Sequence, residues 1–174
     1  MAELAVTAIG ADRPGVVAVI SEVLRQRGGN ILDTSMTILG GHFSMMLLVE
    51  IGERAEQLHD ELRMATSHLA LFVAVTPVAP STRPPNPTHF LSVYGADRPG
   101  VLAGVSRALA DLDVNITDLV TRVLSPQDRP VYAMVFNLEL PHALDSQILE
   151  AALKTTCERL GVDHTLRALE AETY

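Results

Sequence analysis

Apolar residues alternate with polar or small neighbours near the start of each half of the 174-residue chain. Leu4, Val6 and Ala8 follow this spacing in the first half, and Leu91 and Val93 follow it in the second. Successive side chains of a strand point to opposite faces, so the pattern predicts one half-buried strand at each place.

Helical spacing follows each of these strands. The apolar or long side chains that recur with a period near 3.6 are Val16, Ile20, Val23, Leu24 and Arg27, and then Val101, Val105, Ala108, Leu109 and Leu112. We expect Gly28 and Gly29 to end the first helix through a left-handed conformation. Asp113 and Val114 stand at the corresponding places, so we expect the second of these helices to end differently.

A hairpin, a helix and a last strand complete each half. Asn30-Ile31 and Asn115-Ile116 open a strand, and Gly40-Gly41 forms a turn into the strand at 43–51. The second hairpin, which leads into 132–140, has a longer loop at 125–130. Helical spacing returns at Leu58, Leu62, Ala65 and Leu69, and in the second half at Leu149, Leu153, Thr156, Cys157 and Leu160, where Gly161 ends the helix. Alternation then predicts a last strand at Leu71, Val73 and Val75, and another at Val162, His164, Leu166 and Ala168.

The order β-α-β-β-α-β therefore occurs twice. It predicts an α+β protein made of two ferredoxin-like domains, each a four-stranded antiparallel sheet with both helices on one face. Four prolines fall within residues 80–87, where they prevent both a helix and a sheet ladder. We predict domains at 1–79 and 88–174, joined by this linker.

The two halves also share a heptapeptide. Gly10–Val16 returns unchanged as Gly95–Val101, 85 residues later, and 13 of the 24 positions that begin there are identical. The repeat includes Asp, Arg and Asn as well as apolar residues, so we hypothesise that a site was duplicated together with the fold.

Composition narrows the classes of partner. The net charge of −8, the scattered basic residues and the absence of Trp disfavour direct binding to nucleic acid. No apolar run approaches the roughly 20 residues that cross a bilayer, and no secretory signal is evident, so we expect a soluble, cytoplasmic protein without membrane contact. The single cysteine, Cys157, is expected to be a small core residue.

Catalytic and metal chemistry find little support. The six histidines do not match between the halves, and none has metal-ligand spacing. No nucleophile, base and orienting group cluster in the sequence. We therefore predict no catalytic residue, no metal and no cofactor, and an enzyme is the least favoured of the functions considered.

The repeated loop is the best candidate site. It joins a strand to a helix N-terminus, where free N–H groups and the helix dipole favour an anion. We expect Pro14 and Pro99 in the first helical turn, and Asp12 and Asp97 either as caps or facing the positive end of the helix. We also expect the loop to face Asn30 or Asn115, whose amides both donate and accept. The alternative is a capped turn followed by a turn-forming asparagine.

Strand, Asp-Arg-Pro-Gly-Val, helix and Asn-Ile together resemble the ACT domain, a βαββαβ regulatory module, over nearly the whole chain. The resemblance implies ligand-binding residues at Asp12, Arg13, Pro14, Gly15, Val16, Asn30 and Ile31, and at Asp97, Arg98, Pro99, Gly100, Val101, Asn115 and Ile116. It also implies domains joined side by side, as in an eight-stranded sheet or a homodimer.

Among double ACT proteins, the chain resembles the glycine cleavage system transcriptional repressor family. That resemblance implies a sensor of glycine or another small amino acid, which acts by binding a transcription regulator or a metabolic enzyme. The alternatives are an interaction module that senses nothing and a detached regulatory subunit of a metabolic enzyme.

Overall fold

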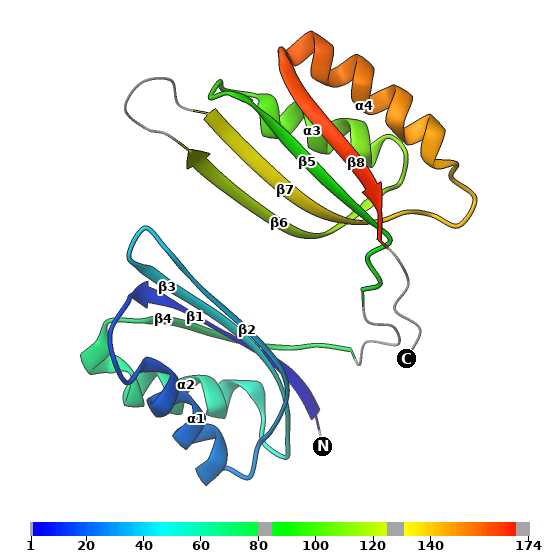
Figure 1. Cartoon of the computed structure of the whole chain (residues 1–174). Helices are drawn as coiled ribbons and strands as arrows, with labels where there is room; N and C mark the ends of the chain where they lie inside the picture. Colours follow the sequence, from blue (N-terminus) through cyan, green and yellow to red (C-terminus); the bar gives the residue numbers. More distant parts are fainter. Residues whose placement is uncertain (1, 80–84, 125–130, 170–174) are drawn as a thin grey trace. The chain divides into compact units, whose positions relative to one another are not determined.

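The computed structural model describes residues 2–79, 85–124 and 131–169, which belong to two compact units, Met1–Thr82 and Arg83–Tyr174 (Figure 1). The first unit contains β1 (Ala2–Ala11), α1 (Val16–Gln26), β2 (Asn30–Leu39), β3 (His42–Ile51), α2 (Ala55–Ala65), the 3-10 turn η1 (Ser67–Leu69) and β4 (Phe72–Pro77). The second contains β5 (His89–Ala96), α3 (Val101–Ala110), β6 (Asn115–Leu124), β7 (Val131–Glu139), α4 (Ser146–Leu160) and β8 (Val162–Ala168). The predicted βαββαβ order is confirmed in both halves.

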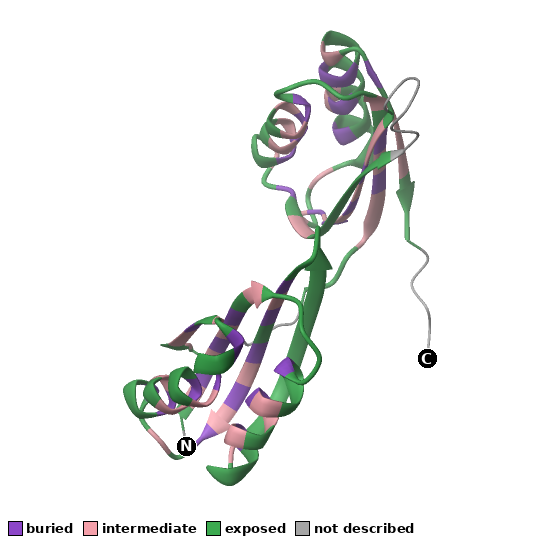
Figure 2. Ribbon diagram, turned by 90° about the vertical axis from the view of Figure 1, so that its left-hand side faces the viewer, coloured by how far each residue is buried: buried purple, intermediate pink, exposed green. Residues whose placement is uncertain are grey.

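Each unit has one antiparallel sheet, with strand order β2-β3-β1-β4 in the first and β6-β7-β5-β8 in the second. Buried residues alternate along the strands (Figure 2), and the buried set packs against the helices, so both helices cover the same face of each sheet. The predicted strand positions Leu4, Val6, Leu91 and Val93 are all at most 1% exposed. The α+β fold of two ferredoxin-like domains is confirmed.

The second helix of the first unit is shorter than predicted. It ends at Ala65, and Leu69 reaches the core from the separate turn η1. The buried Thr66 hydroxyl donates to the Leu62 carbonyl at 2.7 Å, and the same carbonyl accepts the Thr66 backbone N–H at 2.9 Å. In the second unit Cys157 replaces this threonine, and α4 continues without a break to Leu160.

The first helices of the two units end in the same way, so the expectation of a different second exit was wrong. Gly28 has φ 66°, and Asp113, at the corresponding position, has φ 55°. The next residue in each unit, Gly29 or Val114, donates its N–H to the carbonyl five residues earlier, that of Leu24 or Leu109, which is one residue beyond the usual helical partner. Aspartate is among the few residues that adopt the left-handed conformation with modest strain.

Three local predictions are confirmed. Gly40 and Gly41 form the first hairpin turn, both with positive φ, and Gly161 caps α4 with φ 67°. Cys157 is 1% exposed, and burial raises the pKa of its thiol to about 11. The longer hairpin loop at 125–130 lies outside the described residues, as do residues 80–84 of the linker, whose bounds stay a prediction.

In the part of the chain that the structure describes, no helix has the length and apolar character to span a bilayer.

Candidate functional site

The repeated loop reaches its helix through a left-handed glycine. Gly15 and Gly100 precede α1 and α3 with φ 95° and 94°, and neither helix start receives a side-chain cap. A residue with a Cβ is strained in this conformation, so glycine is needed for the backbone itself.

The expected place of the prolines and the capping role of the aspartates were therefore wrong. Pro14 and Pro99 precede the capping glycine and lie outside the first helical turn. Asp12 and Asp97 do not cap their helices. Instead, the Asp12 backbone N–H donates to the Gly41 carbonyl at 3.1 Å and ties the loop to the hairpin turn.

The first glycine of the heptapeptide has a different reason. A Cβ at Gly10 would lie 2.6 Å from Leu71 Cδ2, and one at Gly95 would lie 2.7 Å from Val162 Cγ1. Both distances are well below van der Waals contact. Gly10 and Gly95 therefore allow the strand that follows the second helix to pass close to β1 or β5.

The polar residues of the repeat have no such structural role. Val16 and Val101 are core residues, each 2% exposed, but Asp12, Arg13, Asp97 and Arg98 are exposed. Within the described ranges, none of these four side chains makes a hydrogen bond or an ion pair. The Asp-Arg pair is thus the part of the repeat that the fold does not explain.

In the second unit the loop lines a hollow of ≈ 360 Å³. Its walls are Asp97, Arg98, Pro99, Gly100, Leu102 and Tyr132. The Arg98 guanidinium and the N-terminus of α3 supply the positive groups that a carboxylate needs. Tyr132 pairs with Gly95 as Phe43 pairs with Gly10, so a phenol replaces a fully buried phenyl ring.

The asparagines open the edge strands, as predicted. Asn30 pairs with Glu50, and Asn115 pairs with Glu139. Asn115 lines a smaller hollow of ≈ 180 Å³ with Asp113, Glu139, Leu140, Pro141 and His142. The carboxylates of this hollow favour an ammonium group over an anion. Ile31 is 41% exposed on its edge strand, whereas Ile116 packs against the core of the second unit.

The loop and the asparagine of one unit do not face each other, so that expectation was wrong. Asn30 lies beside Glu50, which pairs with Glu3 at the start of β1, whereas the loop follows Ala11 at its end. Eight residues of strand separate the two places by about 26 Å. Helix α1 returns the chain along the sheet, so β2 starts at the same end as β1.

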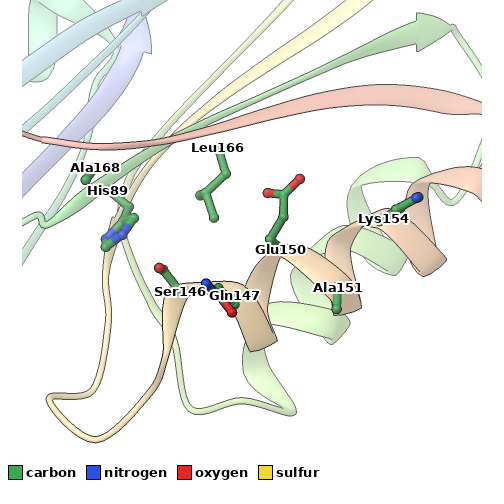
Figure 3. A pocket seen from close by; sticks show the side chains of 8 residues that line it. All are labelled: His89, Ser146, Gln147, Glu150, Ala151, Lys154, Leu166 and Ala168. Carbon is green, nitrogen blue, oxygen red and sulfur yellow. The ribbon is translucent and has the colours of Figure 1, made fainter.

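A third hollow, of ≈ 500 Å³, was missed by sequence reasoning (Figure 3). It lies between the first half of α4 and the paired ends of β5 and β8 and is lined by His89, Ser146, Gln147, Glu150, Ala151, Lys154, Leu166 and Ala168. Burial lowers the pKa of His89. The sequence did contain a clue to this hollow: at the repeat offset of 85 residues, the polar His89 aligns with the apolar Leu4 of the first half.

Among residues 2–79, 85–124 and 131–169, no three His, Cys, Asp or Glu side chains are grouped so that they could hold a metal ion.

Comparison with known proteins identifies the domains. The ACT domain family matches residues 3–76 and again residues 89–155. The glycine cleavage system transcriptional repressor of Escherichia coli strain K12 is 26% identical over 170 residues, which are 95% of this chain and 90% of that protein. Phosphoserine phosphatase SerB2 of Mycobacterium tuberculosis H37Rv is 28% identical over 162 residues, 88% of this chain and 38% of the enzyme.

A solved structure of an unknown protein from Galdieria sulphuraria has the same fold over the whole length. It superposes with a TM-score of 0.82 at 26% identity, and the match covers 97% of this chain and 98% of that one.

Proposed function

The chain belongs to the ACT domain family, and we propose that it is a non-enzymatic, cytoplasmic regulatory protein that binds glycine or another small amino acid. The observation that carries the proposal is the repeated Asp-Arg pair, which is exposed in both units and has no structural role. An amino acid presents a carboxylate and an ammonium group, and the second unit has a hollow suited to each.

The distance between those hollows constrains how a ligand is held. A small amino acid cannot bridge about 26 Å, so the loop of one ACT domain needs the asparagine end of another. Antiparallel addition of one edge strand to a second chain brings the start of one edge beside the end of the other. We propose a homodimer joined in this way, with two four-stranded sheets forming one of eight.

The edge strand of the first unit is suited to such addition. All ten residues of β2 are exposed, and β2 ends the sheet. Its apolar side chains are between 41% and 68% exposed, namely Ile31, Leu32, Met36, Ile38 and Leu39. An edge of this length and composition is a template for strand pairing.

We further propose that the bound state is passed to another protein, such as a transcription regulator. The resemblance to the Escherichia coli repressor over 95% of the chain supports this direction. A net charge of −8 supports contact with a protein partner in preference to DNA, because phosphate binding needs a concentrated basic face.

Calorimetric titration with a panel of amino acids tests the proposal. We expect at least one small amino acid to bind at millimolar concentration or below, and Arg98→Gln and Asn115→Ala to weaken it by about tenfold each. Arg13→Gln and Asn30→Ala are the matched variants of the first unit and report whether its site binds equally. Silence across the whole panel would reject amino-acid sensing.

A detached regulatory subunit is the second candidate. The match to 38% of phosphoserine phosphatase SerB2 favours it, because a chain like this one there forms part of a longer enzyme. Under this alternative the titration is silent, and addition of the purified protein changes the kcat or KM of a metabolic enzyme.

A further inference from the structure

We propose that the hollow beside His89 binds a small amphipathic carboxylic acid, at a site separate from the repeated loop. The hollow lies at the start of β5, and the loop follows the end of the same strand. Seven residues of strand put about 23 Å between them. A ligand in one place therefore does not fill the other.

The hollow exists where the first unit has core residues. His89 corresponds to Leu4, which is 1% exposed, and Ser146 corresponds to Ala55, which is 8% exposed and also begins its helix. Leucine and alanine at these two positions pack against the core of the first unit. Histidine and serine at these positions in the second unit line the hollow and give it hydrogen-bonding groups.

The His89 end of the hollow has a defined acceptor. The Thr88 hydroxyl donates to the Leu138 carbonyl and accepts from the Leu140 N–H, so its remaining lone pair accepts from His89 Nδ1–H at 3.0 Å. Burial lowers the pKa of the imidazole, which keeps the ring neutral near pH 7. Nε2 is then an acceptor, and it suits a ligand hydroxyl.

The other end supplies a positive charge. Lys154 is the only lysine in the sequence, and it lines the hollow two turns along α4 from Ser146, about 12 Å away. The neighbouring carboxylate of Glu150 is engaged by His164 Nε2 at 3.1 Å. No ion pair of Lys154 is seen within the described residues, so a ligand carboxylate has a cation to meet.

The wall that β8 contributes is apolar. Leu166 points from β8 into the hollow, between His89 and Glu150 (Figure 3), and Ala168 lies beside His89, its partner in the β5–β8 ladder. An extended apolar body with a hydroxyl at the His89 end and a carboxylate at the Lys154 end matches this order of groups, and the rise of about 12 Å from Ser146 to Lys154 sets the scale of its length. The ligand class is thus an extended hydroxy acid, longer than an amino acid.

The single lysine makes the test selective. Reductive ¹³C-dimethylation of the full-length chain keeps the charge of Lys154 and labels one side chain besides the α-amine. Titration with 8-hydroxyoctanoate is expected to move the Lys154 signal saturably, and octanoate and 1,8-octanediol, which each lack one polar end, are expected to bind more weakly.

Variants separate binding from folding. His89→Leu with Ser146→Ala restores the residues of the first unit and is expected to abolish the shift without lowering the Tm. By calorimetry, Lys154→Gln should weaken 8-hydroxyoctanoate about tenfold, whereas Arg63→Gln, which removes the charge at the corresponding place in α2, should not. The proposal would be overturned if the Lys154 shift did not saturate or if the double variant His89→Leu with Ser146→Ala still bound 8-hydroxyoctanoate. Equal losses of affinity in Lys154→Gln and Arg63→Gln would also overturn it.

Discussion

The two units keep the same backbone and differ in what fills it. The capping glycines Gly15 and Gly100 have φ values 1° apart, and the edge strands shift register after Ile31 and again after Ile116. Features that depend on local backbone geometry have thus survived the divergence of the two halves.

Side chains near the ends of the helices have changed between the two units, in contrast to the backbone geometry. In the first unit Arg27 Nη1 donates to Glu53 Oε1 at 3.2 Å, and the same guanidinium pairs with Glu61. In the second unit the residues at the Arg27 and Glu61 positions are Leu112 and Ala152. Apolar residues therefore replace the ion-pair cluster in the second unit, where Leu112 and Ala152 both line a hollow of ≈ 640 Å³.

The difference teaches where this fold tolerates change. Replacement of Leu4 by His89 and of Phe43 by Tyr132 introduces polar groups beside hollows, while the strands and helices around them keep their order. The fold constrains the glycines with special backbone conformations and the buried side chains of the strands and helices. Polar side chains have replaced apolar ones at positions on the edge of the core.

The largest effect is expected where the strand that follows the second helix passes close to a glycine of β5 or β1. Gly95→Ala should lower the free energy of unfolding of the second unit by about 2–3 kcal/mol, since the new Cβ would also lie 3.1 Å from the Val162 Cα. Gly10→Ala should cost less, because its nearest obstacle is the tip of the flexible Leu71 side chain and the backbone atoms that it meets, Ala70 O at 3.2 Å and Leu71 Cα at 3.3 Å, lie slightly farther away. Hydrogen exchange of the β5 and β1 amides measures each unit separately; equal costs would contradict this account.

A second prediction concerns the ion-pair cluster. Arg27→Leu places the residue of the second unit in the first and should destabilise the first unit by about 1–2 kcal/mol, because Glu53 and Glu61 lose a shared donor. The Glu53 Oε2 atom is already buried without a hydrogen-bond partner in the described part of the chain.

The control for this variant is an exposed ion pair in the same unit. Arg25 pairs with Glu22 at 2.7 Å, and its hydrogen bonds lower the pKa of Glu22 to about 2, yet both side chains lie in solvent. Arg25→Leu is expected to leave the β1 exchange rates nearly unchanged. A loss as large as that of Arg27→Leu would show that the cluster has no special role.

A third, smaller effect concerns the helix exits. Asp113→Gly should stabilise the second unit and Gly28→Asp should destabilise the first, each by about 0.5–1 kcal/mol, since only glycine adopts positive φ without strain. Denaturant melts followed by exchange in α3 and α1 measure both changes. Shifts of the same sign in the two variants would contradict equivalent exits.

The smallest effect is a dependence on pH in the second unit. The folded pKa of His89 lies below its ordinary value of 6.5, so the unfolded chain binds the proton more readily. Stability linked to His89 is therefore complete above pH 6.5 and falls as pH decreases through the folded pKa. Hydrogen exchange of the β5 amides between pH 7 and pH 5 measures this loss of stability. The pH dependence should vanish in His89→Leu, which introduces the residue that the first unit has at the corresponding position, Leu4.

Local patterns predicted most of the fold. Alternation at Leu4, Val6 and Ala8 identified a strand, and the internal repeat carried each assignment to the second half. The predictions that were wrong concerned backbone details. Periodicity does not reveal that a capping glycine excludes Pro14 from the helix or that Asp113 adopts a left-handed φ.

The site was predicted less well, because it depends on distant parts of the chain. The loop was located from the heptapeptide, but its separation from Asn30 follows from strand direction, which comes from the pairing of β1 and β2 with β3. The hollow at His89 depends on packing between α4 and β8. Alignment of the two halves beyond the heptapeptide, which pairs His89 with Leu4, was the only clue in the sequence.

The register shifts of the edge strands set a length limit on assembly. Past the irregularity, regular pairing with β3 or β7 runs only from Asp33 to Leu39 and from Asp118 to Leu124. A strand that adds to either edge meets seven evenly spaced residues and then a kink that misaligns its next hydrogen bond. The irregularity thus limits the length of a strand that can pair with the edge and fixes its register. It also interrupts the continuous strand addition that leads to fibres.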